Sequence, residues 1–186
     1  MPMIRRLLVS AVSCVLLTTW AAAPAQAALP SKRTWLADVS AAMRGSQRYV
    51  DDRVARGGSH LAINFDIDNT SLATHYDPGK AVRVVLRFAN NARGQGVKLL
   101  FNTGRLRGDG RLIRAKRQLA SAGYRVTEIC GRKQGESLAD SKQRCRRHFV
   151  AEGYTLIANV GNRRTDFTGG NYERAFRLPN YHNQLG

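Results

Sequence analysis

The stretch that most constrains this chain runs from Leu61 to Thr70, LAINFDIDNT. It begins as an apolar run rich in β-forming residues, about as long as one buried strand. Asp66 and Asp68 follow at its end, where ligands gather in open α/β sheets. Close carboxylates repel each other unless a cation is present, so the pair favours a hard metal ion such as Mg²⁺. The alternative is a solvated turn, because Asp, Asn and Thr are common turn residues.

Residues 1–27 have the pattern of a secretory signal peptide. Two arginines precede an apolar run, and Ala-Gln-Ala at 25–27 is a small-x-small cleavage site. The run is interrupted by hydroxyl residues and is short for a membrane span, which argues against a stable membrane anchor. Cys14 raises the alternative of a lipid-anchored cysteine, but the apolar run continues well past it. We therefore expect a secreted protein whose mature chain begins at Ala28.

The chain is strongly basic. Removing the predicted signal peptide takes away two arginines and no acid, so the formal net charge of +17 falls to +15. Such a charge favours anionic partners: phosphate esters, nucleic acid or an acidic cell envelope. The basic residues are scattered rather than packed into one run, and no aromatic-and-basic nucleic-acid motif is found. We therefore expect no specific nucleic-acid binding.

Two cysteines, Cys130 and Cys145, remain after processing. An even count in an exported chain favours a disulfide, and two free buried thiols are the alternative.

The chain after the signal peptide divides into two parts. Residues 28–60 have apolar positions at helical spacing, broken near Gly45, and are predicted to be a helical lead-in that packs on the core. Residues 61–186 alternate between strand and helix patterns and form the main domain. The predicted strands after the first are 97–101, 124–129, 154–160 and 174–178, and the predicted helices are 81–93, 112–122 and 138–152. This order predicts an α/β, Rossmann-like three-layer sandwich with a mainly parallel sheet.

Four segments in this order resemble the motifs of the haloacid dehalogenase (HAD) superfamily of phosphohydrolases. They are Asp66-Ile67-Asp68-Asn69-Thr70, Phe101-Asn102-Thr103-Gly104-Arg105, Lys142, and Gly161-Asn162-Arg163-Arg164-Thr165-Asp166. Residues 142–161 and 176–180 are also similar to the exported acid phosphatases of that superfamily, the group with class B-like enzymes and plant vegetative storage proteins. The resemblance covers about residues 61–180 and implies a HAD-like phosphatase domain.

The resemblance implies a role for each motif residue. Asp66 attacks phosphorus and forms an aspartyl-phosphate that water then hydrolyses. Asp68 protonates the leaving oxygen and then activates the water, so its pKa is expected near the working pH. Thr103 and the backbone N–H of Gly104 bind phosphoryl oxygens, and Lys142 neutralises the charge that gathers there.

The resemblance also implies a Mg²⁺ ion. Its ligands would be the Asp66 carboxylate, the Asp68 backbone carbonyl and the loop with Asn162 and Asp166. The fourth motif usually begins with Asp, whereas Asn162 offers an oxygen without negative charge, so weaker metal affinity is expected. The alternative is therefore a catalytically weak or inactive phosphate-binding or storage-type protein.

Two assignments have competitors. Lys133 lies in a predicted loop, but Lys142 has the family spacing and is preferred for the third motif. Arg105 lies close to Thr103 in the second motif. The sequence is equally compatible with a contact to substrate and with an ordinary surface position for this arginine.

The motif spacing leaves no room for a large cap domain, since 32 residues separate Thr70 from Thr103 and 38 separate Thr103 from Lys142. We therefore expect an open site for small phosphorylated substrates. A homo-oligomer is a separate expectation that the motif spacing does not address. The sequence as a whole predicts an exported, Mg²⁺-dependent acid phosphatase acting on phosphate monoesters.

Overall fold

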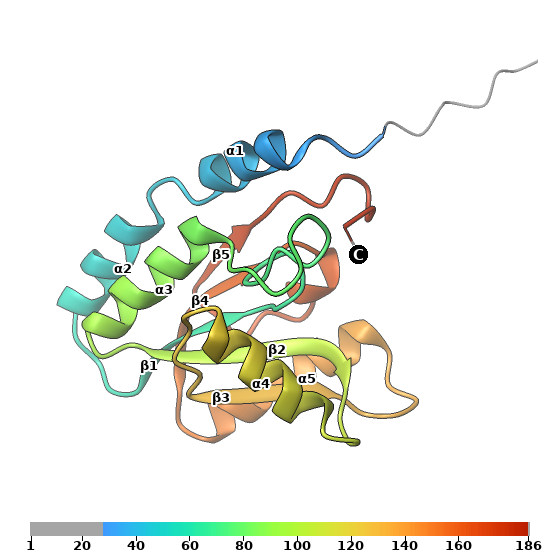
Figure 1. The fold of residues 1–186 in the computed structure, drawn as a ribbon. Helices are drawn as coiled ribbons and strands as arrows, with labels where there is room; N and C mark the ends of the chain where they lie inside the picture. Colours follow the sequence, from blue (N-terminus) through green and yellow to red (C-terminus); the bar gives the residue numbers. More distant parts are fainter. Residues whose placement is uncertain (1–27, 186) are drawn as a thin grey trace, which may run out of the picture.

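A computed structural model describes residues 28–185, so the predicted signal peptide at 1–27 lies outside the described residues. The described chain forms a five-stranded sheet in the order β3-β2-β1-β4-β5, with every neighbouring pair parallel (Figure 1). The strands are β1 (Leu61–Phe65), β2 (Lys98–Leu106), β3 (Glu128–Arg132), β4 (Thr155–Gly161) and β5 (Arg174–Arg177). The predicted α/β fold with a parallel sheet is confirmed.

Helices precede the sheet and connect its strands. They are α1 (Lys32–Ala42), α2 (Ser46–Ala55), α3 (Arg83–Gly94), α4 (Arg111–Ser121), α5 (Leu138–Ala151) and the short 3-10 helix η1 (Arg164–Asp166). Gly45 separates α1 from α2 in a left-handed conformation, with φ of 74°, which is why the helical pattern breaks there. No helix among residues 28–185 is long and apolar enough to cross a membrane.

Two cores lie on opposite faces of the sheet. Ile63 and Phe65 of β1 belong to the larger core, whereas Ala62 between them belongs to the smaller one. Because successive side chains of a strand point to opposite faces, these two cores define the two covered faces. Helices α1 to α4 contribute to the larger core, and α5 contributes Cys145 and Phe149 to the smaller one. The predicted three layers are therefore present, and among the α-helices of residues 28–185 only α5 contributes to the smaller core.

Several strand boundaries differ from those predicted. The third strand was predicted at 124–129 but lies at Glu128–Arg132. Tyr124 instead closes the turn after α4, and its buried hydroxyl donates a hydrogen bond to the Ser71 carbonyl at 2.9 Å. Strand β2 continues to Leu106, past the predicted end at residue 101, while β1 already ends at Phe65.

The predicted disulfide is present and links β3 to α5. Cys130 and Cys145 are joined with their Cα atoms 5.7 Å apart. Cys130 lies in the middle of β3 rather than at its end, and both residues belong to the smaller core. The bond therefore fixes α5, which carries Lys142, against an edge strand of the sheet.

Replacing both Cys130 and Cys145 by Ser is expected to lower the free energy of unfolding by about 3 kcal/mol, because the bond closes a loop with a sequence separation of 15. Urea unfolding of the oxidised protein and of the double variant measures this difference. Equal midpoints, or two freely alkylated thiols in the unreduced protein, would contradict the assignment.

Candidate active site

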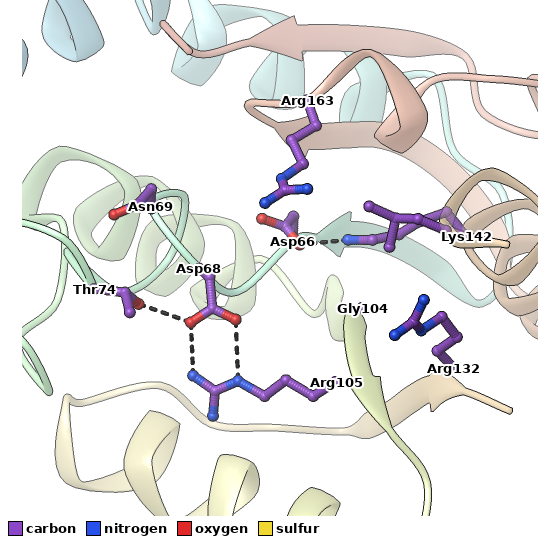
Figure 2. Close-up of a pocket in the computed structure, with 10 residues that line it drawn as sticks. Asp66, Asp68, Asn69, Thr74, Gly104, Arg105, Arg132, Lys142 and Arg163 are labelled. Carbon is purple, nitrogen blue, oxygen red and sulfur yellow. Dashed lines mark hydrogen bonds and ion pairs between the residues drawn. The ribbon is translucent and has the colours of Figure 1, made fainter. Parts of the chain in front are cut away.

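A pocket of about 420 Å³ lies where the carboxyl ends of β1, β2 and β3 and the helix α5 meet (Figure 2). Its lining consists of Asp66, Asp68, Asn69, Thr74, Gly104, Arg105, Arg132, Leu138, Lys142 and Arg163. Parallel strands bring their carboxyl ends to one edge of the sheet, which explains why motifs far apart in sequence meet here. Among residues 28–185, no element forms a large cap over the site.

A tight turn after β1 positions the two aspartates. The backbone N–H of Asp66 donates to the Val160 carbonyl at 2.9 Å, and Ser71 Oγ donates to the Asp66 carbonyl at 2.7 Å. The Ile67 carbonyl accepts N–H groups from the three residues 70–72, which bends the chain sharply. The stretch therefore forms a turn, and this turn directs both carboxylates into one pocket.

Lys142 is the central cation of the site. Its side chain is buried, forms an ion pair with Asp66 Oδ1, and lies 2.8 Å from Asp166 Oδ1. Its Nζ also donates to the Asn102 carbonyl at 2.7 Å, and Asn102 Nδ2 donates back to the Lys142 carbonyl at 2.8 Å. Lys133, the competing candidate, is exposed in the turn after β3 and faces another pocket. The geometry thus supports Lys142 for the third motif.

The burial of Asp66 and Lys142 changes the pKa of both. Burial raises the pKa of Asp66 to about 7, although the charge of Lys142 acts in the opposite direction. Burial alone would lower the pKa of Lys142, but the carboxylates of Asp166 and Asp66 outweigh it and the pKa is raised. Lys142 therefore stays charged, and Asp66 depends on neighbouring cations to remain an ionised nucleophile.

Asp68 is held in a two-pronged ion pair with Arg105. Arg105 Nε and Nη2 donate to its two carboxylate oxygens at 3.0 and 2.7 Å, and Thr74 Oγ1 donates at 2.8 Å. Burial raises the pKa of Asp68, but the hydrogen bonds and charge of Arg105 outweigh it, so the pKa lies below its ordinary value. The prediction that this pKa lies near the working pH is wrong for the ligand-free site. Arg105 itself contacts the proposed acid–base group.

The residues of the second motif lie beside the pocket. Thr103 is fully buried, does not line the pocket, and its Oγ1 accepts the Arg105 N–H at 3.2 Å. Gly104 lines the pocket, and a Cβ at this position would lie 2.7 Å from Leu138 Cδ1. The glycine therefore lets β2 pass close to α5 and keeps its backbone accessible from the pocket.

Asp166 holds the loop after β4 together. Its Oδ2 accepts the backbone N–H groups of Asn162 at 3.0 Å and Arg163 at 2.9 Å, while Oδ1 faces Lys142. The residue is 2% exposed. Its carboxylate is therefore already engaged on both oxygens.

Arg146 on α5 also holds the loop after β4, a role that was not predicted from the sequence. Its guanidinium is fully buried and donates to the carbonyls of Asp166 at 2.5 Å, Gly170 at 2.7 Å and Thr168. Arg146 lies four residues after Lys142 on α5, so the two cations share one face of the helix. That spacing was the one available signal for its role.

The predicted metal ligands fit a tightly bound divalent ion poorly. The described residues hold no group of three or more His, Cys, Asp or Glu side chains that could hold a metal ion. The Asp68 carboxylate is paired with Arg105, and the Asp166 carboxylate with Lys142 and two backbone amides. Of the predicted ligands, one oxygen of Asp66, the Asp68 backbone carbonyl and the amide oxygen of Asn162 are left. Together these three oxygens carry one negative charge at most, which is little for Mg²⁺. Mg²⁺ binding stays a prediction.

Two arginines that line the pocket were not assigned from the sequence. Arg132 ends β3 and Arg163 follows β4, and both side chains extend into the pocket in Figure 2. Neither forms an ion pair with a carboxylate in the part of the chain that the structure describes. Arg132 was not assigned because the third strand was predicted to end at residue 129, three residues too early. Arg163 directly follows the motif residue Asn162, and this position was a signal for its role. Together they give the pocket an excess of positive charge.

A family model described as HAD superfamily, subfamily IIIB (acid phosphatase), matches residues 76–184, more than half of the chain. The chain belongs to this acid phosphatase family. It is therefore a phosphoric monoester hydrolase by family. The matched residues include the second, third and fourth motifs but begin after Asp66 and Asp68, whose placement rests on the structure.

The fold is also similar to a solved acid phosphatase structure. The class C acid phosphatase from Bacillus anthracis aligns with a TM-score of 0.61 and 16% sequence identity, over 81% of this chain and 79% of that chain. At this identity the likeness concerns the fold alone. No curated protein sequence matches the chain significantly.

Replacing Arg105 by Met is expected to move the descending limb of the pH–rate profile to higher pH. Asp68 must be protonated to act as an acid, and removing the guanidinium raises its pKa, so the protonated form persists to higher pH. Plots of kcat/KM against pH measure the shift, with Arg107→Met, an exposed arginine two residues away, as control. Superimposable profiles for Arg105→Met and the unaltered protein would contradict the coupling.

Proposed function

We propose that this acid phosphatase family member hydrolyses phosphate monoesters through an aspartyl-phosphate at Asp66. The observation that carries the proposal is the pairing of Asp66, at the end of β1, with buried Lys142 in a pocket rich in arginine. A carboxylate between fixed cations can approach a phosphoryl dianion that would otherwise repel it.

The first step transfers the phosphoryl group to the protein. A carboxylate oxygen of Asp66 attacks phosphorus, the ester P–O bond breaks, and the leaving oxygen takes the proton of Asp68. Lys142, together with the backbone of Gly104, would hold phosphoryl oxygens during transfer. The arriving phosphate competes with Asp68 for Arg105, which would free Asp68 to take up a proton.

The second step returns the site to its starting state. Asp68, now ionised, takes a proton from a water molecule as the water oxygen attacks phosphorus. The bond between phosphorus and Asp66 breaks, inorganic phosphate leaves, and the Asp66 carboxylate is regenerated. Water can reach this intermediate because the pocket opens to solvent and no large cap covers it in the described part of the chain.

Export is a further proposal, and the metal requirement is measured separately. The signal-peptide pattern at 1–27 and the disulfide between Cys130 and Cys145 support secretion. Members of the superfamily generally use a divalent metal, commonly Mg²⁺, and assays with and without added Mg²⁺ measure the requirement here.

A weakly active or storage-type protein is the second candidate, favoured by Asn162 in place of the usual Asp. The two candidates differ in turnover. A phosphatase turns over a chromogenic aryl phosphate many times per protein molecule, whereas a storage-type protein binds phosphate without appreciable turnover.

Replacing Asp66 by Asn is expected to lower kcat/KM for the aryl phosphate by about 10³-fold or more, because the phosphoryl acceptor is lost. Steady-state assays of the purified mature protein measure the change. Asp52→Asn, an exposed aspartate on α2, is the matched control and is expected to retain full activity. Activity that survives Asp66→Asn would refute the assignment.

A further inference from the structure

The negative charges around Asp66 are offset without a divalent ion. Asp66 and Asp166 contribute two negative charges, and Lys142, Arg132 and Arg163 contribute three positive ones. Asp68 and Arg105 form a neutral pair of their own beside this group. A chain with Asp at position 162 and a neutral residue at 163 would have one more negative charge and one fewer positive charge, a difference of two units that one Mg²⁺ ion would neutralise.

Asn162 has a structural role that an aspartate would not fill. Its Nδ2 donates to the Leu185 carbonyl at 3.1 Å, and its Oδ1 accepts a long hydrogen bond from Thr70 Oγ1 at 3.4 Å. The side chain is 6% exposed. An Asp at 162 would set a buried carboxylate against the Leu185 carbonyl, which is unfavourable unless a cation lies between them. The amide therefore suits a site arranged without an ion at this position.

Arg163 occupies the side of Asp66 away from Lys142. Figure 2 shows its guanidinium directed toward the Asp66 carboxylate, while Lys142 approaches from α5. The Arg163 backbone N–H is held by Asp166 at 2.9 Å, so the chain that carries this guanidinium is fixed. The residue is half-buried and lines the pocket. A planar guanidinium presents several N–H donors that match the oxygens of a phosphoryl group.

We propose that Arg163 is a catalytic residue that supplies, beside Asp66, the positive charge for which other phosphatases use a tightly bound divalent ion. Its guanidinium binds two phosphoryl oxygens while Asp66 attacks, so phosphoryl transfer persists after divalent ions are removed. This inference rests on the proposed function, in which Asp66 is the phosphoryl acceptor.

The kinetic test compares aryl phosphatase activity in excess chelator and in added Mg²⁺. The unaltered protein is expected to keep its kcat/KM in chelator to within about twofold, and Arg163→Met to lose about 10²-fold, as for loss of one preorganised charge donor. Arg163→Lys is expected to recover part of this loss, because it restores the charge without the planar donor set. Arg164→Met, the exposed neighbouring arginine, is the control and is expected to keep full activity.

Two binding measurements test the inference without turnover. In chelator, orthovanadate is expected to bind the unaltered protein, and Arg163→Met to weaken that binding by about tenfold or more, through loss of charge-assisted hydrogen bonds. Mg²⁺ is expected to leave the Tm of the unaltered protein unchanged and to raise that of Asn162→Asp, whose new carboxylate needs a cation.

Two results would overturn the inference while leaving Asp66 as the acceptor. One is loss of activity in chelator that Mg²⁺ restores, together with a Mg²⁺-dependent rise in the Tm of the unaltered protein. The other is an Arg163→Met variant that matches the unaltered protein in both chelator activity and vanadate binding. In each case an inactive Asp66→Asn variant shows that the proposed function still holds. An active Asp66→Asn variant would overturn the proposed function, and the inference with it.

Discussion

The buried ion pairs of Lys142 with Asp66 and Asp166 are the interactions on which the rest of the site depends. A buried ammonium is tolerated only when nearby carboxylates and hydrogen bonds compensate for its lost hydration, and here two carboxylates and the Asn102 carbonyl do so. The same contacts join β1, β2, α5 and the loop after β4. Removing Lys142 would therefore leave the buried carboxylates of Asp66 and Asp166 without their shared cation, so the charge proposed to serve catalysis also holds these elements together.

The scaffold around this centre explains why α5 carries so much of the site. Among the described α-helices only this one packs on its face of the sheet, and it is joined to β3 by the disulfide and to the loop after β4 by Arg146. One helix thus positions Lys142 and, through Arg146, the loop that presents Arg163. The disulfide fixes the helix that supplies the buried cation of the pocket.

The sequence predicted the fold and the motif residues because both depend on local patterns: apolar runs, glycine punctuation and polar residues after strands. It did not predict the low pKa of Asp68, which depends on Arg105 reaching it from a strand 37 residues away. The role of Arg146 was not predicted either, because the sequence of a strongly basic helix does not show which of its arginines is buried. The two unassigned pocket arginines share that difficulty: in a chain with 30 Lys and Arg residues, only the tertiary structure shows which of them line the pocket.

The most direct measurement of the central claim is the site of the covalent intermediate. The protein would be mixed with an aryl phosphate, quenched in acid during turnover, and digested for tandem mass spectrometry. A phosphoryl group is expected on Asp66, and it should disappear when unquenched protein is left to complete hydrolysis. A phosphoryl group on another residue, or active turnover with no covalent adduct at any quench time, would contradict it.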